Sequence, residues 1–252
     1  MKKNMVLAVV VTLTLLASMP LGAVAQADSA RQGSGRSDAT SAPGHTLDLD
    51  QAKERLEQAI DRRLDRVDRL QERVRSSDAL APGHAAQLTS ELSRAQGGLS
   101  ALLPEVARAD TLEGLRSIAT EMVEDYRIYL VMTPKTLLTI ASDHGVAVSG
   151  RMSGISARIA EAVERAANAG FDVTDVEALV GSADEMIANG LRFIDPVAEM
   201  VLPMQPADYP DPAETVLYEA HQSALEARAE LREAATVLRE AADLLRDIVG
   251  AG

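Results

Sequence analysis

Apolar residues recur every three or four positions along most of the chain between residues 49 and 249. This period keeps them on one face of an α-helix, whereas a half-buried strand would need strict alternation. Proline, glycine and short polar runs divide the pattern into six segments. We therefore predict an all-α protein with helices over about 49–74, 82–109, 110–132, 133–167, 174–195 and 211–249.

In several segments the three- and four-residue spacings alternate strictly, which is the heptad seam of helices packed side by side. Short connections favour antiparallel neighbours, so we predict an antiparallel bundle of five to six long amphipathic helices with heptad seams. The lengths fit two three-helix groups that share a kinked central helix over 112–167. They fit a single compact bundle nearly as well. The clearest seam lies in the last segment: Leu217, Ala220, Ala224, Ala227, Leu231, Ala234, Leu238, Ala241, Leu245 and Ile248.

Local signals mark several helix ends. Asp110 and Thr174 each precede a glutamate by three residues, the spacing of a capping box, so both are expected N-caps. Gly170 is the expected C-terminal stop of the fourth helix. Pro104 should kink or end the second helix. At Pro134 we expect two helical segments to meet.

The first 27 residues have the organisation of a secretory signal peptide. Two lysines precede an apolar run that ends near Leu16, and cleavage after Ala25 or Ala27 fits the small-x-small rule. The alternative is an uncleaved membrane anchor, although the run is shorter than the roughly 20 residues that a spanning helix needs. We predict a secreted or extracytoplasmic protein.

Residues 28–46 are polar and lack an apolar period, which is typical of a disordered linker. The helical domain is then expected over 47–250, with the joint near residue 133 as its point of subdivision.

Composition and charge narrow the function classes. Aromatic residues make up 2% of the chain, which leaves little material for a deep ligand pocket. The formal net charge of −13 argues against nucleic acid, whose phosphates require a basic surface. No cysteine is present, which excludes disulfides, thiol catalysis and thiolate metal sites.

A search for catalytic and metal-binding motifs leads to no site. The four histidines are dispersed, and none follows a glutamate at the three-residue spacing of di-iron bundles. Phosphate-loop, nucleophile-elbow and zinc-protease patterns are absent from the sequence. His144 lies on an apolar stripe and is expected to be a core or helix-end residue. We predict a protein that is not an enzyme and that uses no cofactor or metal.

One cluster combines aromatic and charged side chains: Asp125, Tyr126, Arg127, Tyr129 and Lys135. It is either a recognition patch at the joint or a structural feature. In the structural interpretation, the two tyrosines fill the heptad seam of the third helix while Asp125 and Arg127 are solvated.

The first helix is rich in arginine, and an acidic residue lies within one turn of each arginine. Asp65 with Arg69, and Arg69 with Glu72, have the spacing of helix ion pairs. The arginines form either a polyanion site or, as we favour, a solvated face of paired charges.

Three short runs resemble a family of exported, Ala-rich helical proteins of high-GC Gram-positive bacteria (actinobacteria), which are generally uncharacterised. The runs are Ala59-Ile-Asp-Arg-Arg-Leu64, Asp125-Tyr-Arg-Ile-Tyr129 with Pro134-Lys135 behind it, and Pro206-Ala-Asp-Tyr209. The resemblance extends from about Gln51 to the C-terminus. It implies export and helicity and brings no known activity.

These features favour an exported, non-enzymatic helical protein of the cell envelope or secreted fraction. It would act as a scaffold, a spacer or a partner-binding module. The expected partner is an envelope protein or a second copy bound through helix faces, with no nucleic acid and no membrane span after signal cleavage. One alternative is a lipid- or apolar-ligand-handling protein that opens its bundle. Another is a signal-anchored stalk or sensor.

Overall fold

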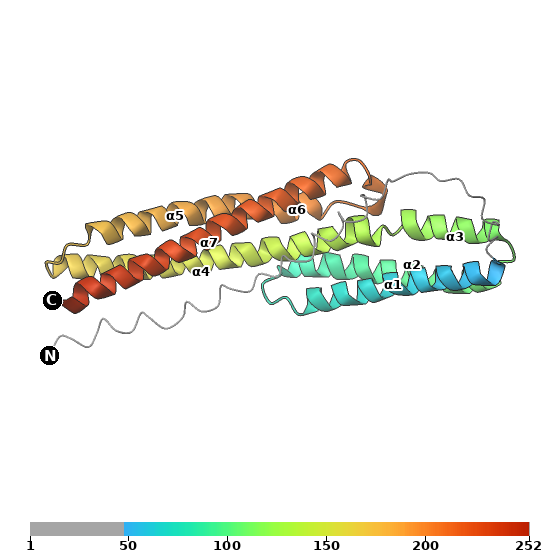
Figure 1. Ribbon diagram of the computed structural model, residues 1–252, viewed down its shortest axis with the longest axis horizontal. Helices are drawn as coiled ribbons and strands as arrows, with labels where there is room; N and C mark the ends of the chain where they lie inside the picture. The colour runs from blue at the N-terminus through green and yellow to red at the C-terminus, as the bar shows by residue number, and fades with distance from the viewer. Residues whose placement is uncertain (1–47, 252) are drawn as a thin grey trace, which may run out of the picture. The chain divides into compact units, whose positions relative to one another are not determined.

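The computed structural model describes residues 48–251, and every secondary-structure element within them is helical, as predicted. The predicted signal peptide over 1–27 and the linker over 28–46 lie outside the described residues. The elements are α1 (Leu49–Arg75), α2 (Pro82–Arg108), α3 (Leu112–Glu124), the π-helix η3 (Ile128–Met132), α4 (Thr133–Asn168), α5 (Thr174–Ile194), α6 (Val197–Val201), the 3-10 helix η4 (Pro206–Asp208) and α7 (Ala213–Ala251) (Figure 1).

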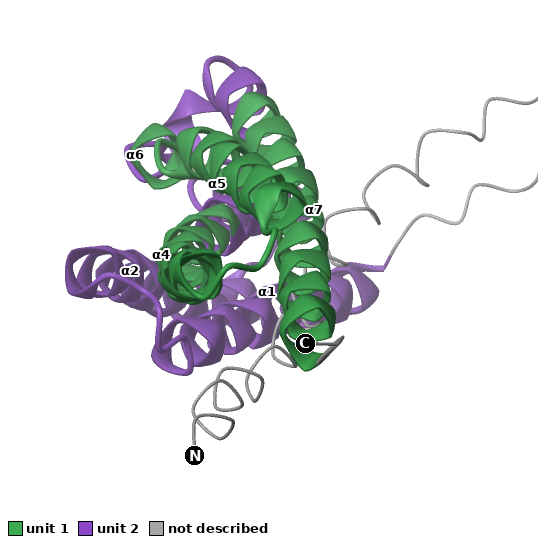
Figure 2. Ribbon diagram, turned by 90° about the vertical axis from the view of Figure 1, so that its left-hand side faces the viewer, with its two compact units in different colours: residues 1–19, 138–201, 218–252 green, residues 20–137, 202–217 purple. Residues whose placement is uncertain are grey.

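The described residues form two compact units, coloured separately in Figure 2. Unit 1 comprises residues 138–201 and 218–251, and unit 2 comprises residues 48–137 and 202–217. Three long helices build each unit: most of α4 and α7 with α5 in unit 1, and α1, α2 and α3 in unit 2. Both α4 and α7 begin in unit 2 and continue into unit 1.

In unit 2, α1 and α2 form an antiparallel hairpin around a short turn (Figure 1). Each helix buries the apolar stripe that its sequence predicts, because residues three and four apart share one face. The buried members of the hairpin core are Leu56, Ile60, Val67, Leu70, Val74, Leu88, Leu92, Ala95, Leu99, Leu102 and Val106.

In unit 1, apolar side chains of α4, α5 and α7 form one core. The α7 seam has the predicted register, since all its members from Leu217 to Leu245 are buried. Alanine on this seam permits a close approach of the neighbouring helix. At the point of approach, a Cβ atom added to Gly190 of α5 would lie 2.8 Å from Cγ of Leu231.

Several predicted helix ends need correction. The N-cap of α3 is Thr111 and not Asp110, because the Thr111 hydroxyl accepts a hydrogen bond from the Gly114 amide at 3.1 Å. Thr174 is the first residue of α5 and not its cap, and Asp172 accepts hydrogen bonds from its amide and hydroxyl groups. These two bonds lower the pKa of the Asp172 carboxyl.

Of the two residues that were predicted to end helices, Pro104 does not do so and Gly170 does. Pro104 lies inside α2, which continues to Arg108, so this proline does not end the helix. Gly170, two residues after the last residue of α4, has a φ of +91°, and the Phe171 backbone N–H donates to the Ala166 carbonyl across it at 3.2 Å. The predicted stop at Gly170 is therefore confirmed, since glycine adopts this left-handed conformation without a Cβ clash.

The break in the middle of the chain lies earlier than predicted. The α3 helix ends at Glu124, and Arg127 has a left-handed conformation with φ 33° and ψ 47°. Helical turns resume at Ile128 as a π-helix and pass without interruption into α4 at Thr133. Tyr126 and Tyr129 therefore do not share a heptad seam with α3, because the helix ends before both of them.

None of the described helices is long and apolar enough to cross a membrane.

Candidate functional site

The five residues of the predicted cluster lie in unit 2, but they do not form one patch. Asp125 is the exposed C-cap of α3. Lys135 is completely buried, with 0% of its surface exposed, so it cannot belong to a surface patch. The remaining three side chains contact different parts of unit 2.

Tyr126 is half-buried and lies against Gly98 of α2. A Cβ atom at position 98 would overlap the end of the tyrosine ring, so glycine is what admits the ring there. Burial, followed by the nearby carboxylates of Glu121, Asp125 and Glu105, raises the pKa of the Tyr126 hydroxyl. The side chain is thus a neutral packing residue at physiological pH.

Arg127 holds the left-handed turn before η3. Its guanidinium carbon lies 5.0 Å from the ring centroid of Tyr209, a cation–π contact with the segment that follows η4. A non-glycine residue in this conformation costs roughly 1–2 kcal/mol, and contacts elsewhere must compensate for it. Tyr209 therefore contributes to the stability of this irregular backbone.

Tyr129 is the exposed member of the cluster, with 49% of its surface accessible. Its hydroxyl donates a hydrogen bond to the Arg62 carbonyl of α1 at 3.2 Å, and the Arg63 guanidinium carbon lies 5.4 Å from its ring centroid. The next residue, Leu130, is 46% exposed. The η3 segment thus presents two large apolar side chains to solvent, one of them held in place by α1.

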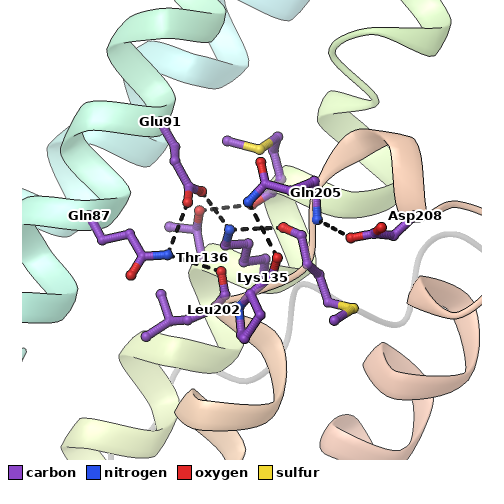
Figure 3. Close-up of polar contacts among 10 residues, drawn as sticks. Gln87, Glu91, Lys135, Thr136, Leu202, Gln205 and Asp208 are labelled. Atoms are coloured by element: carbon purple, nitrogen blue, oxygen red, sulfur yellow. Dashed lines mark hydrogen bonds and ion pairs between the residues drawn. The ribbon is translucent and has the colours of Figure 1, made fainter.

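Lys135, in the first turn of α4, points toward Glu91 of α2, as Figure 3 shows. Its Nζ lies 2.5 Å from a Glu91 carboxylate oxygen and donates to the Met204 carbonyl at 2.9 Å. The other Glu91 oxygen accepts from the Gln87 amide at 3.1 Å, and this amide also donates to the Leu202 carbonyl at 3.0 Å. The Lys135–Glu91 ion pair is almost completely shielded from solvent, since the Glu91 side chain is only 10% exposed.

This network, Gln87–Glu91–Lys135, ties three separate parts of unit 2 together: α2, the start of α4, and the segment before η4. The segment also has its own capping box, in which the backbone N–H of Gln205 donates to the Asp208 carboxylate at 2.7 Å. A fully buried ammonium group does not meet a soluble substrate. We therefore assign the network a structural role and no catalytic one.

No local sequence pattern identifies Glu91, Gln87 or Tyr209 as partners of the cluster, but one signal marks Lys135 itself. Lys53 and Lys135 are the only lysines between residues 48 and 251, and Lys135 stands in an apolar run. It is also the first of four buried polar residues that are spaced seven positions apart along α4: Lys135, Ser142, Ser149 and Ser156. Within unit 1, Ser142 donates to the Ile194 carbonyl at 2.8 Å, next to the break between α5 and α6.

The predicted charge pairs of α1 are not formed. Glu72 pairs with Arg75 at 3.1 Å and not with Arg69, and Asp68 accepts a hydrogen bond from Gln96 of α2. No ion pair between Asp65 and Arg69 occurs. The two predicted ion pairs are therefore wrong, whereas the face is solvated as predicted, since Arg62, Arg69 and Arg73 are exposed.

Within residues 48–251, no three histidine or acidic side chains come close enough together to hold a metal ion. His144 is half-buried in α4, where burial, and then repulsion from Arg151, lowers the pKa of its imidazole. Comparisons of the chain with protein-family models, with curated proteins and with solved structures find no match.

Proposed function

We propose that this chain is an exported, non-enzymatic helical-bundle protein that acts as a partner-binding module or scaffold in the cell envelope or secreted fraction. The signal-like first 27 residues and the resemblance to exported Ala-rich proteins support export. The partner is a protein bound through helix faces.

The observation that carries partner binding is the exposure of Tyr129 and Leu130 on η3. Large apolar side chains exposed side by side are typical of protein interaction sites, and tyrosine is enriched among the residues that dominate binding energy. The backbone that presents them is irregular, with a left-handed Arg127 and a π-helical turn, and such deviations gather at functional sites. We name Tyr129 and Leu130 together the η3 surface.

The test is site-specific photo-cross-linking in the producing cell. A photoreactive phenylalanine analogue replaces Tyr129 in one variant and Tyr218 in the other. Tyr218 is the matched control, because it is a tyrosine of α7 with 64% exposure and belongs to unit 1. We expect a discrete cross-linked protein from position 129, recovered in the wall or medium fraction, and none from position 218.

Two results would contradict the proposal. Equal cross-linking at both positions would mean that the η3 surface is not a specific site. Recovery of the chain only in the cytoplasm, with its first 27 residues intact, would remove the export part.

A further inference from the structure

The surface of α1 is divided into three faces of different chemistry. The apolar face lies in the core of unit 2. On one side of it runs an acidic stripe, and on the other side a stripe of arginines, because each set repeats at three-, four- or seven-residue intervals. The acidic stripe is Asp50, Glu54, Glu57, Asp61, Asp65, Asp68 and Glu72. The arginine stripe is Arg55, Arg62, Arg66, Arg69 and Arg73.

The arginines of the stripe are accessible to solvent, and none of them is held in an ion pair within the described part of the chain. Four of its members are exposed and Arg66 is half-buried. In the described part of the chain, no carboxylate lies within ion-pairing distance of any of the five. Burial, followed by repulsion from Arg73 and Arg69, lowers the pKa of the Arg66 guanidinium. The acids of α1 lie within one turn of several of these arginines, as Asp65 does of Arg69, but none of them forms an ion pair with the stripe.

The arginine stripe borders the η3 surface. Arg66 donates from Nε to the Thr133 hydroxyl at 3.2 Å, directly after η3. Tyr129 donates to the Arg62 carbonyl, and Arg63 stacks on its ring. Exposed cations and exposed apolar side chains thus adjoin within unit 2, and arginine and tyrosine are both enriched at protein-binding hot spots.

We propose that the arginine stripe and the η3 surface form one docking surface, and that its occupant is an acidic helical segment of a partner protein. This assignment rests on the proposed function and names the chemistry of the partner. The stripe is straight and spans about 27 Å along α1, the length of five helical turns. A partner helix with carboxylates at three- and four-residue spacing has the same rise, so each arginine can meet one carboxylate.

The surroundings of the stripe favour such a helix over a nucleic acid. Residues 48–251 carry 21 basic and 36 acidic side chains, a net charge of −15. The acidic stripe runs parallel to the arginines on the same helix. A duplex about twice as wide as a helix would bring its phosphates against those acids, and long-range repulsion would oppose its approach. A single helix is narrower than a duplex and carries fewer negative charges toward those acids.

Charge and apolar contact have different roles in this arrangement. Exposed ion pairs contribute only about 0–1 kcal/mol each, so the arginines supply orientation and association rate more than affinity. Tyr129 and Leu130 supply apolar area that the partner covers. The partner helix therefore carries an apolar residue beside its carboxylates.

The test uses a synthetic helical peptide of about 21 residues with a glutamate stripe and two leucines, labelled for fluorescence anisotropy at about 50 mM salt. Full-length protein is compared with Arg62→Glu/Arg69→Glu and with the control Arg232→Glu/Arg239→Glu. All four arginines are exposed, and both variants change the net charge equally. The control pair lies on α7, in unit 1. Circular dichroism verifies that both variants fold.

We expect the α1 variant to bind the peptide about ten-fold more weakly and the α7 variant to bind within about two-fold of wild type. A peptide with glutamine in place of glutamate should bind more weakly than the acidic one.

Equal losses of affinity in the two variants, or no binding of the acidic peptide, would overturn the proposal. Equal or tighter binding of a DNA duplex of matched length would assign the stripe to nucleic acid instead. If the cross-link at position 129 persists while the peptide fails, only the acidic partner is wrong; if both fail, the proposed function is wrong as well.

Discussion

Replacing Glu91 by leucine is expected to lower the free energy of unfolding by about 3–5 kcal/mol, the usual cost of leaving one member of a buried ion pair without its partner. The variant removes the Glu91 carboxylate from the ammonium of Lys135, whose exposure is 0%. It also removes one of the two acceptors of the Gln87 side-chain amide. Urea unfolding followed by circular dichroism measures the change.

The control is the double variant Glu91→Leu/Lys135→Met, which removes both charges together. Buried pairs replaced by apolar residues of similar size are often neutral in stability. Here the Met204 carbonyl also loses its donor, at a cost of about 1–3 kcal/mol. We expect the double variant to be more stable than Glu91→Leu alone. A single variant that costs under about 1 kcal/mol, or a double variant that shows the sum of both single losses, would mean that the two charges do not interact.

The second large effect is expected at the closest approach of α5 and α7. Gly190→Ala should destabilise unit 1 by about 1–3 kcal/mol through overpacking, although alanine is the better helix former. The added Cβ atom would lie 2.8 Å from two carbon atoms of Leu231, which is itself only 2% exposed and has little room to move.

The matched control is Gly181→Ala on the same helix. A Cβ atom at position 181 meets nothing within 4 Å, so the substitution should stabilise by about 0.5–1 kcal/mol through helix propensity alone. The two variants are thus expected to shift the thermal midpoint in opposite directions. Shifts of the same sign would show that helix propensity, and not packing against Leu231, decides both.

The helices could be predicted from the sequence because apolar periodicity records which face of each helix is buried. The α7 register is the clearest case, since an alanine at every seventh position needs a close neighbour to be stable there. Helix ends were predicted less well. Asp110 and Thr111 are both good caps, and the choice between them depends on a backbone conformation that composition does not show.

The candidate site could be predicted only in part. Ile128–Met132 looks like one more helical turn in sequence, because a π-turn preserves the apolar run while shifting the side chains around the axis. The partner of Lys135 lies 44 positions earlier in the chain, and no local pattern links the two residues. The arginines of α1 were recognised as a solvated group, but the spacing of Asp65, Arg69 and Glu72 only permits ion pairs, and side-chain conformation decides whether they form.

We propose that a partner covers the η3 surface where the protein works. Hydroxyl-radical footprinting on intact producing cells, compared with the purified chain, tests it most directly. We expect Tyr129 and Leu130 to be oxidised in the purified chain and protected in cells, with Tyr218 equally reactive in both. Equal reactivity of Tyr129 in cells and in the purified chain would contradict the account, because the η3 surface would then remain uncovered.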